Sequence, residues 1–568
     1  MKPGRITRVA GPLVEAEDVG PVAMNDLVAI GDAGIPAEVM AIRDNRVSLQ
    51  AYEYTGGLAP GAPVVAAGRP LSVRLGPGLL GQVHDGLMRP LSSAPAFLGP
   101  GVTVEPPGGS WRFEPRVAAG ADVEAGQLLG VVSDAGPLEH RVLVPPDLGG
   151  AVDAVAEGRC GAQDVVATVS GRPVGLFTDW PVRRPRPHRA RVDDVEPLHT
   201  GQRVLDLLYP LVRGGTATVP GGFGTGKTML LQQLAKWCDA DVIVYTGCGE
   251  RGNELAEIVA ELLELSDPRT GGRLADRTVV IANTSNMPMM AREASVYTAV
   301  AVAEYYRDMG YHAVVIADST SRWAEALREY ASRSGALPAE EGYPADLASA
   351  IAAFYERAGA VETLGRRAGS VTIVGAVSPP GGDMTEPVTA CTERFVRCRW
   401  TLDRDLAYAR HYPAVSWSGS FSRDTEALTA RSPDPAWAAR RARVATLLAD
   451  ADRLSALADL LGAAALSDAE RTTLLAGRLL RDAVLQQNAL SPADSLSPPG
   501  KTGALTDAVL AVVDRCRERV SAGTPVEALE GFDFTSLVRL REEAGPDQGD
   551  LIARCRDTVL AGLADVGP

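Results

Sequence analysis

The chain has 568 residues, of which 46% are apolar and 22% charged, a composition typical of a folded protein with several domains rather than a disordered chain. Its formal net charge is -15, from 71 acidic and 56 basic side chains. The average field therefore disfavours nonspecific binding of a phosphate backbone, and we expect no nucleic-acid partner. Seven scattered cysteines, never in a CxxC pattern, predict free thiols with neither a zinc site nor a disulfide framework.

The start of the chain, "MKPGRITRVAGPLVEAEDVG", lacks the continuous apolar stretch of a secretory signal. No window approaches the roughly 18 uninterrupted apolar residues of a membrane span. We therefore expect that any work at a membrane is done through partners.

Two β-rich units are expected in the first third of the chain. Residues 1–70 alternate short apolar runs with turn residues, as in "RITRVAGPLVEA" and "DLVAIG", which predicts a small β-barrel or sandwich. Residues 95–185 continue in the same style, rich in glycine, proline and valine, and predict a second β unit. The prolines and arginines of "DWPVRRPRPHRARV" then predict a stiff, exposed linker.

The pattern changes near residue 200, and we assign residues 186–423 to one α/β domain. Apolar runs such as "DVIVYTGC", "RTVVIANTS", "YHAVVIADS" and "GSVTIVGAV" alternate with helical segments such as "NELAEIVAELLEL". Continuous Val/Ile runs are typical of strands buried on both faces, and so of a parallel sheet covered by helices. Residues 424–568 carry apolar residues at helical spacing and predict an α-helical domain.

The most specific motif is "GGFGTGKT" at residues 221–228, which follows the apolar run "TATVP" and precedes a helical segment. Its glycines let backbone N–H groups wrap a phosphate, Lys227 reaches the β- and γ-oxygens, and the Thr228 hydroxyl is a Mg²⁺ ligand. The alternative is a chance glycine turn in a glycine-rich chain. The strand before the loop and the helix after it favour the phosphate loop.

Two further strand ends carry acidic side chains. Asp318 ends "YHAVVIAD", where a carboxylate beside the phosphate loop would hold the Mg²⁺ shell, although aspartate also caps helices. Glu250 and Arg251 follow "VIVYTGCG", where they would deprotonate the attacking water and neutralise phosphate charge. The structural alternative for Glu250 is a first-turn acid of a helix that begins near Asn253.

These motifs, together with "ADSTSRWAEALRE", "GSVTIVGAVSPPGGDMTEPVT" and "RHYPAVSW", resemble the catalytic A subunit (alpha chain) of the V/A-type rotary ATPases. The resemblance runs from the first strand to about residue 490. It implies an N-terminal β-barrel (1–70), an inserted β-rich bulge domain (95–185), a central RecA-like P-loop NTPase domain with a parallel sheet (186–423) and a helical C-terminal domain (424–568).

The resemblance also implies roles for individual residues. Glu250 would be the general base, Lys227 and Arg251 would contact phosphate, and Thr228 and Asp318 would lie beside Mg²⁺. Tyr412 would stack on adenine, although a core aromatic is the alternative, and Arg322 would lie near the phosphates or form a salt bridge to a helix. The nucleotide-binding set is Gly221, Gly222, Phe223, Gly224, Thr225, Gly226, Lys227, Thr228, Met229 and Tyr412.

Two positions depart from the family's pattern. Gly222 stands where relatives usually carry proline or alanine, which predicts a more mobile loop. Leu490, in "LQQNALSPADS", replaces the ring that ends the adenine pocket in relatives.

The function that the resemblance implies is synthesis of ATP from ADP and phosphate with a proton or sodium gradient, or hydrolysis of ATP to pump ions. The cofactor would be Mg²⁺ with ATP or ADP. The expected partners are a non-catalytic B subunit in an alternating hexameric ring, which supplies an arginine finger, the central and peripheral stalk subunits and, indirectly, a membrane ion channel. The expected location is the cytoplasmic face of the cell membrane.

Two rival functions remain open at this point. A RecA-like ring helicase or terminator would need a basic channel or aromatic base platforms, for which the net charge gives no support. A non-catalytic nucleotide-binding structural subunit would keep the phosphate loop but lose the base, and this sequence has Glu250.

Overall fold

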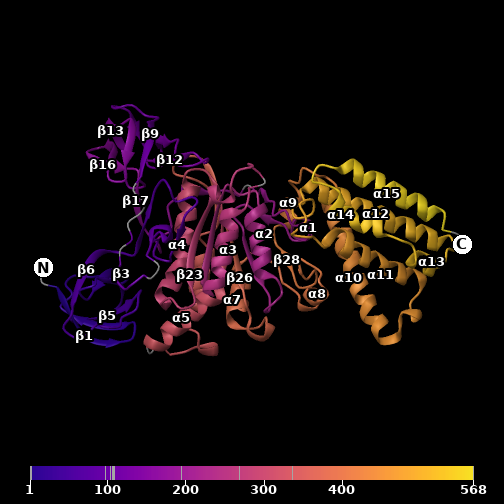
Figure 1. Ribbon diagram of the computed structural model, residues 1–568, viewed down its shortest axis with the longest axis horizontal. Helices are drawn as coiled ribbons and strands as arrows, with labels where there is room; N and C mark the ends of the chain where they lie inside the picture. The colour runs from indigo at the N-terminus through magenta and orange to yellow at the C-terminus, as the bar shows by residue number, and fades with distance from the viewer. Residues whose placement is uncertain are drawn as a thin grey trace.

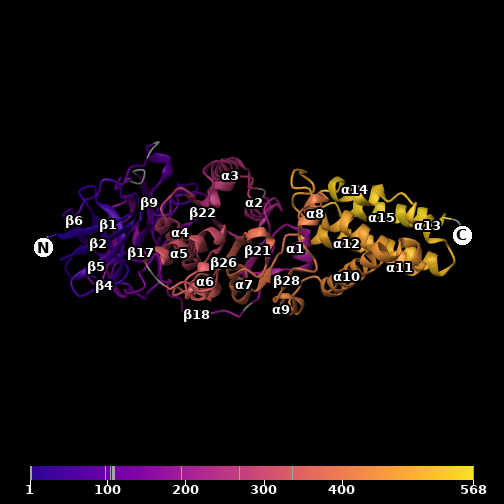
Figure 2. The ribbon, with the colours of Figure 1, turned by 90° about the horizontal axis from the view of Figure 1, so that it is seen from below.

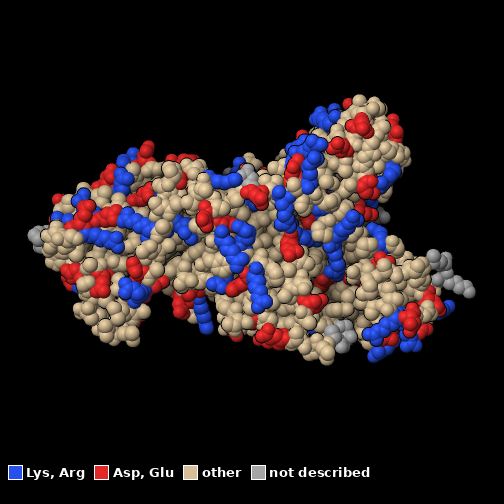
Figure 3. Space-filling view, turned by 180° about the vertical axis from the view of Figure 1, so that it is seen from behind, with Lys and Arg blue, Asp and Glu red and all other residues tan. Residues whose placement is uncertain are grey.

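The structure is a computed structural model, which describes residues 3–95, 98–102, 104, 109–193, 195–267, 269–334 and 337–566. The chain runs along an elongated molecule, with β-rich units at one end, an α/β domain in the middle and helices at the other end (Figure 1). The view turned by 90° shows the same order (Figure 2). On the face seen in Figure 3, acidic and basic side chains are interspersed. Among the described residues, no helix is long and apolar enough to cross a membrane.

The first unit is a closed β-barrel with the strand order β1-β2-β5-β4-β3-β6. Alternate side chains along these strands point inward, so that Val14, Val28, Ile30 and Leu49 are fully buried in one apolar cluster. The predicted barrel is confirmed. Its strands are β1 (Gly4–Ala10), β2 (Leu13–Glu17), β3 (Asp26–Ile30), β4 (Ile35–Arg43), β5 (Arg46–Ala51) and β6 (Pro63–Pro70).

The second β-rich unit projects from the side of the molecule (Figure 1). It consists of two antiparallel sheets with the orders β10-β13-β15-β16 and β12-β11-β9-β14. After β7 (Ser72–Leu75) the chain adds β8 (Val83–His84) to the edge of the central sheet and then forms this unit. It leaves the unit through β17 (Thr178–Pro181), which pairs with β7, so the unit is an insertion. The other strands are β9 (Ser110–Pro115), β10 (Asp122–Val123), β11 (Leu128–Val132), β12 (His140–Leu143), β13 (Gly150–Val155), β14 (Gly158–Gly161), β15 (Val165–Val169) and β16 (Arg172–Gly175).

The predicted exposed linker, residues 179–192, is buried over its first part, and there the prediction is wrong. Trp180, Val182 and Arg186 are all more than nine-tenths buried. Arg183 donates hydrogen bonds to Glu38 of the barrel at 3.0 Å and to Glu293 of the central domain at 2.6 Å. Arg183 and Arg186 form ion pairs, because a buried charge is tolerated only with a partner, whereas Arg184, Arg189 and Arg191 are exposed.

The central domain is a mainly parallel sheet with helices on both faces. The strand order is β28-β27-β21-β26-β24-β22-β23-β8, and β22 and β24 are buried almost throughout, as their apolar runs predict. Its main strands are β21 (Thr216–Pro220), β22 (Val242–Glu250), β23 (Thr278–Thr284), β24 (His312–Asp318) and β26 (Ala368–Val377). Shorter strands are β8 (Val83–His84), β18 (Ala190–Arg191), β19 (Pro197–Leu198), β20 (Leu211–Val212), β25 (Gly359–Glu362), β27 (Cys398–Arg399) and β28 (Phe421–Ser422).

Alternate strand residues contribute to two separate cores. Ile243 and Tyr245 of β22 pack in the cluster that contains residues of α2 and α3, whereas Val242 and Val244 pack in the cluster of α4 to α7. The predicted RecA-like α/β architecture is confirmed. The helices are α1 (Arg203–Leu208), α2 (Lys227–Trp237), α3 (Gly252–Glu264), α4 (Met289–Asp308), α5 (Thr320–Ser334), α6 (Leu347–Tyr355), α7 (Pro387–Phe395), α8 (Arg404–Tyr408) and α9 (Thr425–Thr429).

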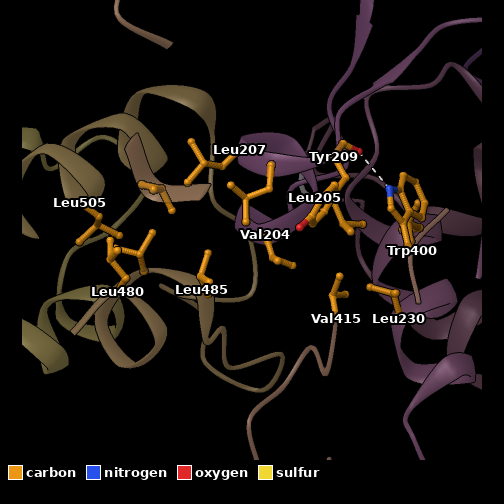
Figure 4. Packing of buried hydrophobic residues seen from close by; sticks show 14 of the residues in the cluster. Val204, Leu205, Leu207, Tyr209, Leu230, Trp400, Val415, Leu480, Leu485 and Leu505 are labelled. Atoms are coloured by element: carbon orange, nitrogen blue, oxygen red, sulfur yellow. Dashed lines mark hydrogen bonds between the residues drawn. The ribbon is translucent and has the colours of Figure 1, made fainter. Parts of the chain in front are cut away.

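The C-terminal domain is helical, as predicted, and shares its core with the central domain. Figure 4 shows Val204 and Leu205 of α1 between Trp400 on one side and Leu480 and Leu505 on the other. Trp400 also donates its indole N–H to the Tyr209 carbonyl at 3.0 Å. The helices are α10 (Trp437–Leu461), α11 (Asp468–Leu480), α12 (Pro499–Ser521), α13 (Val526–Glu530), α14 (Thr535–Glu543) and α15 (Gly549–Ala564), and a π-helical turn at Arg481–Leu485 follows α11.

Candidate functional site

The phosphate loop lies between β21 and α2, as the motif requires. A Cβ atom at Gly221 would lie 2.7 Å from the Thr225 hydroxyl oxygen and 2.9 Å from Leu402 Cβ, so no larger residue fits without a shift. Gly226 has a φ of +88°, which glycine adopts without strain. Because α2 begins at Lys227, its free backbone N–H groups and positive dipole end lie at the loop, as in an anion site.

Lys227 and Thr228 sit at the start of α2. The Lys227 ammonium donates hydrogen bonds to the Gly221 carbonyl at 2.6 Å and the Gly222 carbonyl at 2.8 Å. Burial lowers the pKa of Lys227, and the charges of Asp318 and Glu250 oppose that shift. The Thr228 hydroxyl donates to Asp318 Oδ2 at 3.3 Å. The structure thus brings the lysine, the hydroxyl and the strand-end carboxylate together.

Asp318 is the last residue of β24 and is 4% exposed. Burial raises the pKa of this carboxyl, whereas a hydrogen bond from Tyr245 and the positive charge of Lys227 act to lower it. The structure provides two oxygen ligands, the Thr228 hydroxyl and the Asp318 carboxylate, within hydrogen-bond distance beside the loop. Mg²⁺ prefers oxygen ligands and needs few of them from the protein when it also binds phosphate and water, so these residues fit the ion.

Glu250 is the last residue of β22, which pairs in parallel with β24. Helix α3 begins at Gly252 with Arg251 as its N-cap, and the acidic residue of its first turn is Glu254. Burial and the neighbouring charge of Asp318 raise the pKa of Glu250 to about 7, against the opposing charge of Arg322. A carboxyl with a pKa near neutrality is suited to general-base chemistry.

The two arginines are more exposed than the carboxylates. Arg251 lies 3.3 Å from Glu254, and Arg322 lies 3.0 Å from Glu325, each one helical turn away. Arg322 thus forms the salt bridge to a helix that the sequence left as one alternative. Both arginines also line a cavity of about 1150 Å³ that the phosphate loop borders. The same cavity is lined by Glu250, Asp318, Lys227, Thr228 and Phe223.

A second cavity, of about 390 Å³, shares Gly226, Met229 and Leu402 with the first. Tyr412 borders it, with its ring 3.4 Å from the position of a Cβ at Gly226, and is 42% exposed rather than in the core. Leu490 lines the same cavity and is 87% exposed. The cavity suits a flat apolar ring beside the phosphate loop.

Sequence reasoning missed several residues of these cavities. Gln202, Gln486 and Arg541 line the second cavity, and Arg541 donates a hydrogen bond to Gln486 at 3.0 Å. They come from the start of α1, from the segment after α11 and from α14, and no motif connects them. Tyr245, which donates a hydrogen bond to Asp318 Oδ2 at 3.0 Å, was also missed, because a tyrosine inside an apolar strand looks like a core residue.

The fold and the phosphate loop define a P-loop NTPase with a RecA-like nucleotide-binding domain, a β-barrel before it and helices after it. The chain belongs to the ATP synthase alpha/beta family, within its V/A-type alpha chains. The model of the family's nucleotide-binding domain matches residues 201–422, and that of its beta-barrel domain matches residues 6–68. The models of the barrel-sandwich domain and of the C-terminal domain of V and A type ATP synthases match residues 108–183 and 427–529.

Individual relatives are similar over almost the whole chain. The V-type ATP synthase alpha chain of Anaeromyxobacter dehalogenans (strain 2CP-C) is 50% identical over 539 residues, which is 93% of each chain. The V-type ATP synthase alpha chain of Nitrosococcus oceani is 48% identical over 553 residues, 94% of this chain and 93% of that one.

Among solved structures, the ATPase EscN from the enteropathogenic E. coli type III secretion system covers 90% of this chain with a TM-score of 0.64. At 22% sequence identity, this likeness concerns the fold alone. The family resemblance is confirmed, and neither rival function, structural protein or helicase, is favoured.

Proposed function

We propose that this chain is the catalytic subunit of a V/A-type rotary ATP synthase and that Glu250 is its general base. The observation that carries the proposal is the position of Glu250 in the same cavity as Lys227, Thr228 and Asp318. A protein that only held nucleotide would need the loop but not a carboxyl whose pKa is raised to about 7. ATP and ADP are the proposed nucleotides, with Mg²⁺ as cofactor.

The proposed reaction is transfer of the γ-phosphoryl group to water, or its reverse. Glu250 accepts a proton from the attacking water, whose oxygen bonds to the γ-phosphorus while the bond to the β–γ bridging oxygen breaks and ADP leaves. Bound Mg²⁺ would neutralise charge that develops on the phosphate oxygens. Thr228 and Asp318 are its proposed protein-side ligands, directly or through water.

Lys227 and the arginines are assigned to the phosphates. Phosphate oxygens would replace the carbonyl oxygens of Gly221 and Gly222 as acceptors for the Lys227 ammonium, a short movement because the lysine already lies over the loop. Arg251 is the proposed γ-phosphate contact, and it would exchange its 3.3 Å pair with Glu254 for the nucleotide. An exposed ion pair of this kind costs little to break, on the order of 1 kcal/mol or less.

The adenine base is assigned to the second cavity, against Tyr412. The supporting observations are the shared wall at Gly226 and Met229 and the exposure of the ring. Leu490 would cover the base with an aliphatic surface in place of a ring. The nucleotide would then lie with its phosphates on residues 221–228 and its base between Tyr412 and the segment that contains Leu490.

The partners and the location are also part of the proposal. A non-catalytic B subunit would alternate with this chain in a hexameric ring and supply an arginine finger, worth about 10³ to 10⁵ in rate. Central and peripheral stalk subunits would connect the ring to a membrane sector that carries protons or sodium ions. The chain would therefore work at the cytoplasmic face of the cell membrane as a peripheral subunit.

Two substitutions in the reconstituted complex test the assignment. We expect Glu250→Gln to bind MgATP normally and to hydrolyse it at least about 10²-fold more slowly, because the base acts only in the chemical step. We expect Lys227→Ala to weaken nucleotide binding itself. Binding is measured by equilibrium titration and turnover by phosphate release.

The matched control is Glu264→Gln, an exposed glutamate at the end of α3, which should leave both quantities unchanged. Unchanged hydrolysis in Glu250→Gln would reject the role of the base. Unchanged binding in Lys227→Ala would reject the phosphate site.

A further inference from the structure

Tyr245 is a fully buried residue of β22 that touches the proposed metal side of the site. Its hydroxyl donates a hydrogen bond to Asp318 Oδ2 at 3.0 Å. The register of the parallel pair explains how the two meet, since Gly247 of β22 lies opposite Asp318 of β24. Gly247 has no side chain, and Tyr245 is two residues before it on the same face of the strand. The Tyr245 hydroxyl can therefore pass Gly247 and reach the Asp318 carboxylate.

The two hydrogen bonds to the Asp318 carboxylate end on the same oxygen. Thr228 donates to Oδ2 at 3.3 Å and Tyr245 donates to Oδ2 at 3.0 Å. Within the described part of the chain, Oδ1 accepts no hydrogen bond, and Asp318 lines the cavity beside the phosphate loop. The carboxylate is thus fixed through one oxygen while the other remains able to accept a hydrogen bond from a ligand in the cavity.

Packing alone does not require the phenol hydroxyl of Tyr245. The ring of a phenylalanine would fill the same apolar space in the cluster around Ile243 and Ile316, and burying a hydroxyl costs free energy unless it is hydrogen-bonded. Its partner is the one carboxylate that ends β24. The hydrogen bond between the two side chains therefore indicates that Tyr245 orients the Asp318 carboxylate.

We propose that Tyr245 is a positioning residue for Mg²⁺, which holds Oδ2 of Asp318 so that Oδ1 faces the metal and its water shell. This inference rests on the proposed function, because it requires Asp318 to lie on the Mg²⁺ side of a bound nucleotide. Groups that orient metal-side ligands typically change metal affinity by about 10- to 100-fold when they are removed. Tyr245 is fully buried and is not among the lining residues of either cavity, so the proposed role is positioning rather than catalysis.

The test is Tyr245→Phe in the full-length chain, with ADP affinity measured at increasing Mg²⁺ and in EDTA. We expect the Mg²⁺ concentration at half-maximal effect to rise about 10-fold, while the metal-free ADP affinity and the thermal unfolding temperature match those of the control. The control is Tyr306→Phe, which removes a hydroxyl from a buried tyrosine of α4 in the other core cluster. An unchanged Mg²⁺ midpoint, or an equal loss of metal-free affinity, would overturn the inference.

A third variant separates this inference from the function on which it rests. Asp318→Asn keeps the size of the side chain and should raise the Mg²⁺ midpoint more than Tyr245→Phe does. An effect of Asp318→Asn with none for Tyr245→Phe would overturn the inference alone. No effect of either substitution would overturn the metal-side assignment of Asp318 as well.

Discussion

Glu250 is the residue whose environment most directly sets the chemistry of the site. It ends a buried strand, and burial together with the charge of Asp318 raises its pKa from the usual value of 4.5 to about 7. The same cavity is lined by Lys227, Thr228 and Asp318, to which the proposed phosphoryl transfer assigns the remaining roles. Adjacent strand ends therefore combine into one site although they lie about 70 residues apart in the sequence.

The raised pKa predicts how activity depends on pH. A general base works only when it is unprotonated, so kcat/KM for MgATP should fall about tenfold per pH unit below about 7.

Steady-state kinetics of the reconstituted complex over about pH 5.5 to 8 would measure this profile. A kcat/KM that stays flat across this range would contradict the assignment. Binding of MgADP, measured over the same range, controls for a loss of nucleotide affinity at low pH.

At the scale of elements, the phosphate loop combines two glycines with different physical roles. No described heavy atom lies within 4 Å of a Cβ built at Gly222, whereas a Cβ at Gly221 would meet Thr225 and Leu402 below 3 Å. A Cβ therefore fits at position 222 without contact, whereas at position 221 it would force the neighbouring atoms to shift. The expectation that Gly222 makes the loop more mobile remains a prediction.

Alanine substitutions distinguish the two positions. We expect Gly222→Ala to bind MgATP and to raise the free energy of unfolding by about 0.4 to 1 kcal/mol, because alanine reduces the entropy of the unfolded chain. We expect Gly221→Ala to weaken MgATP binding by at least about tenfold, because the loop must shift. Equilibrium titration and chemical denaturation would measure these effects. Equal behaviour of the two variants would show that the loop is not constrained as described.

The elements differ in how far the sequence predicts them. The long apolar runs of β22, β23, β24 and β26 predict a buried parallel sheet because strands covered on both faces carry few polar residues. The apolar periodicity that would predict helix α5 is weak, because much of the buried face of this helix consists of Trp323 and small alanines. Strand β8 joins the edge of the sheet beside β23 from about 200 residues upstream, a pairing that no local pattern carries.

The residues of the site also differ in how far the sequence predicts them. Lys227, Thr228, Asp318 and Glu250 are predictable because each sits where a strand or loop motif ends at one edge of a parallel sheet. Tyr245 and Arg541 are not, since one is indistinguishable from a core residue and the other enters from the C-terminal helices. The domain bounds at residues 70, 95, 185 and 423 remain predictions.

At the scale of the whole molecule, charged contacts join the domains. Arg183 connects Glu38 of the barrel, which is 1% exposed at its side chain, with Glu293 of α4. Tyr52 donates a further hydrogen bond to Glu38 at 2.7 Å. The barrel is thereby tied to the central domain through one arginine that the sequence suggested was exposed.

Removal of that arginine should therefore destabilise the molecule. Arg183→Leu leaves two buried carboxylates without their cation, which we expect to cost about 3 to 5 kcal/mol of unfolding free energy. The control is Arg69→Ala, which breaks an exposed pair with Asp179 at 3.5 Å and should cost no more than about 1 kcal/mol. Denaturation of the full chain followed by circular dichroism measures both. Similar small losses would show that Arg183 does not hold the domains together.

The proposed activity requires that this chain breaks and makes the γ-phosphate bond rather than only holding the nucleotide. A single-turnover experiment on the reconstituted complex tests it most directly, with radiolabelled MgATP bound in less than the amount of sites and the reaction quenched in acid. We expect the unmodified complex to yield ADP and phosphate, whereas the Glu250→Gln complex should return the bound nucleotide as ATP on the same timescale. Equal conversion to ADP in both complexes would show that Glu250 is not the general base of this reaction.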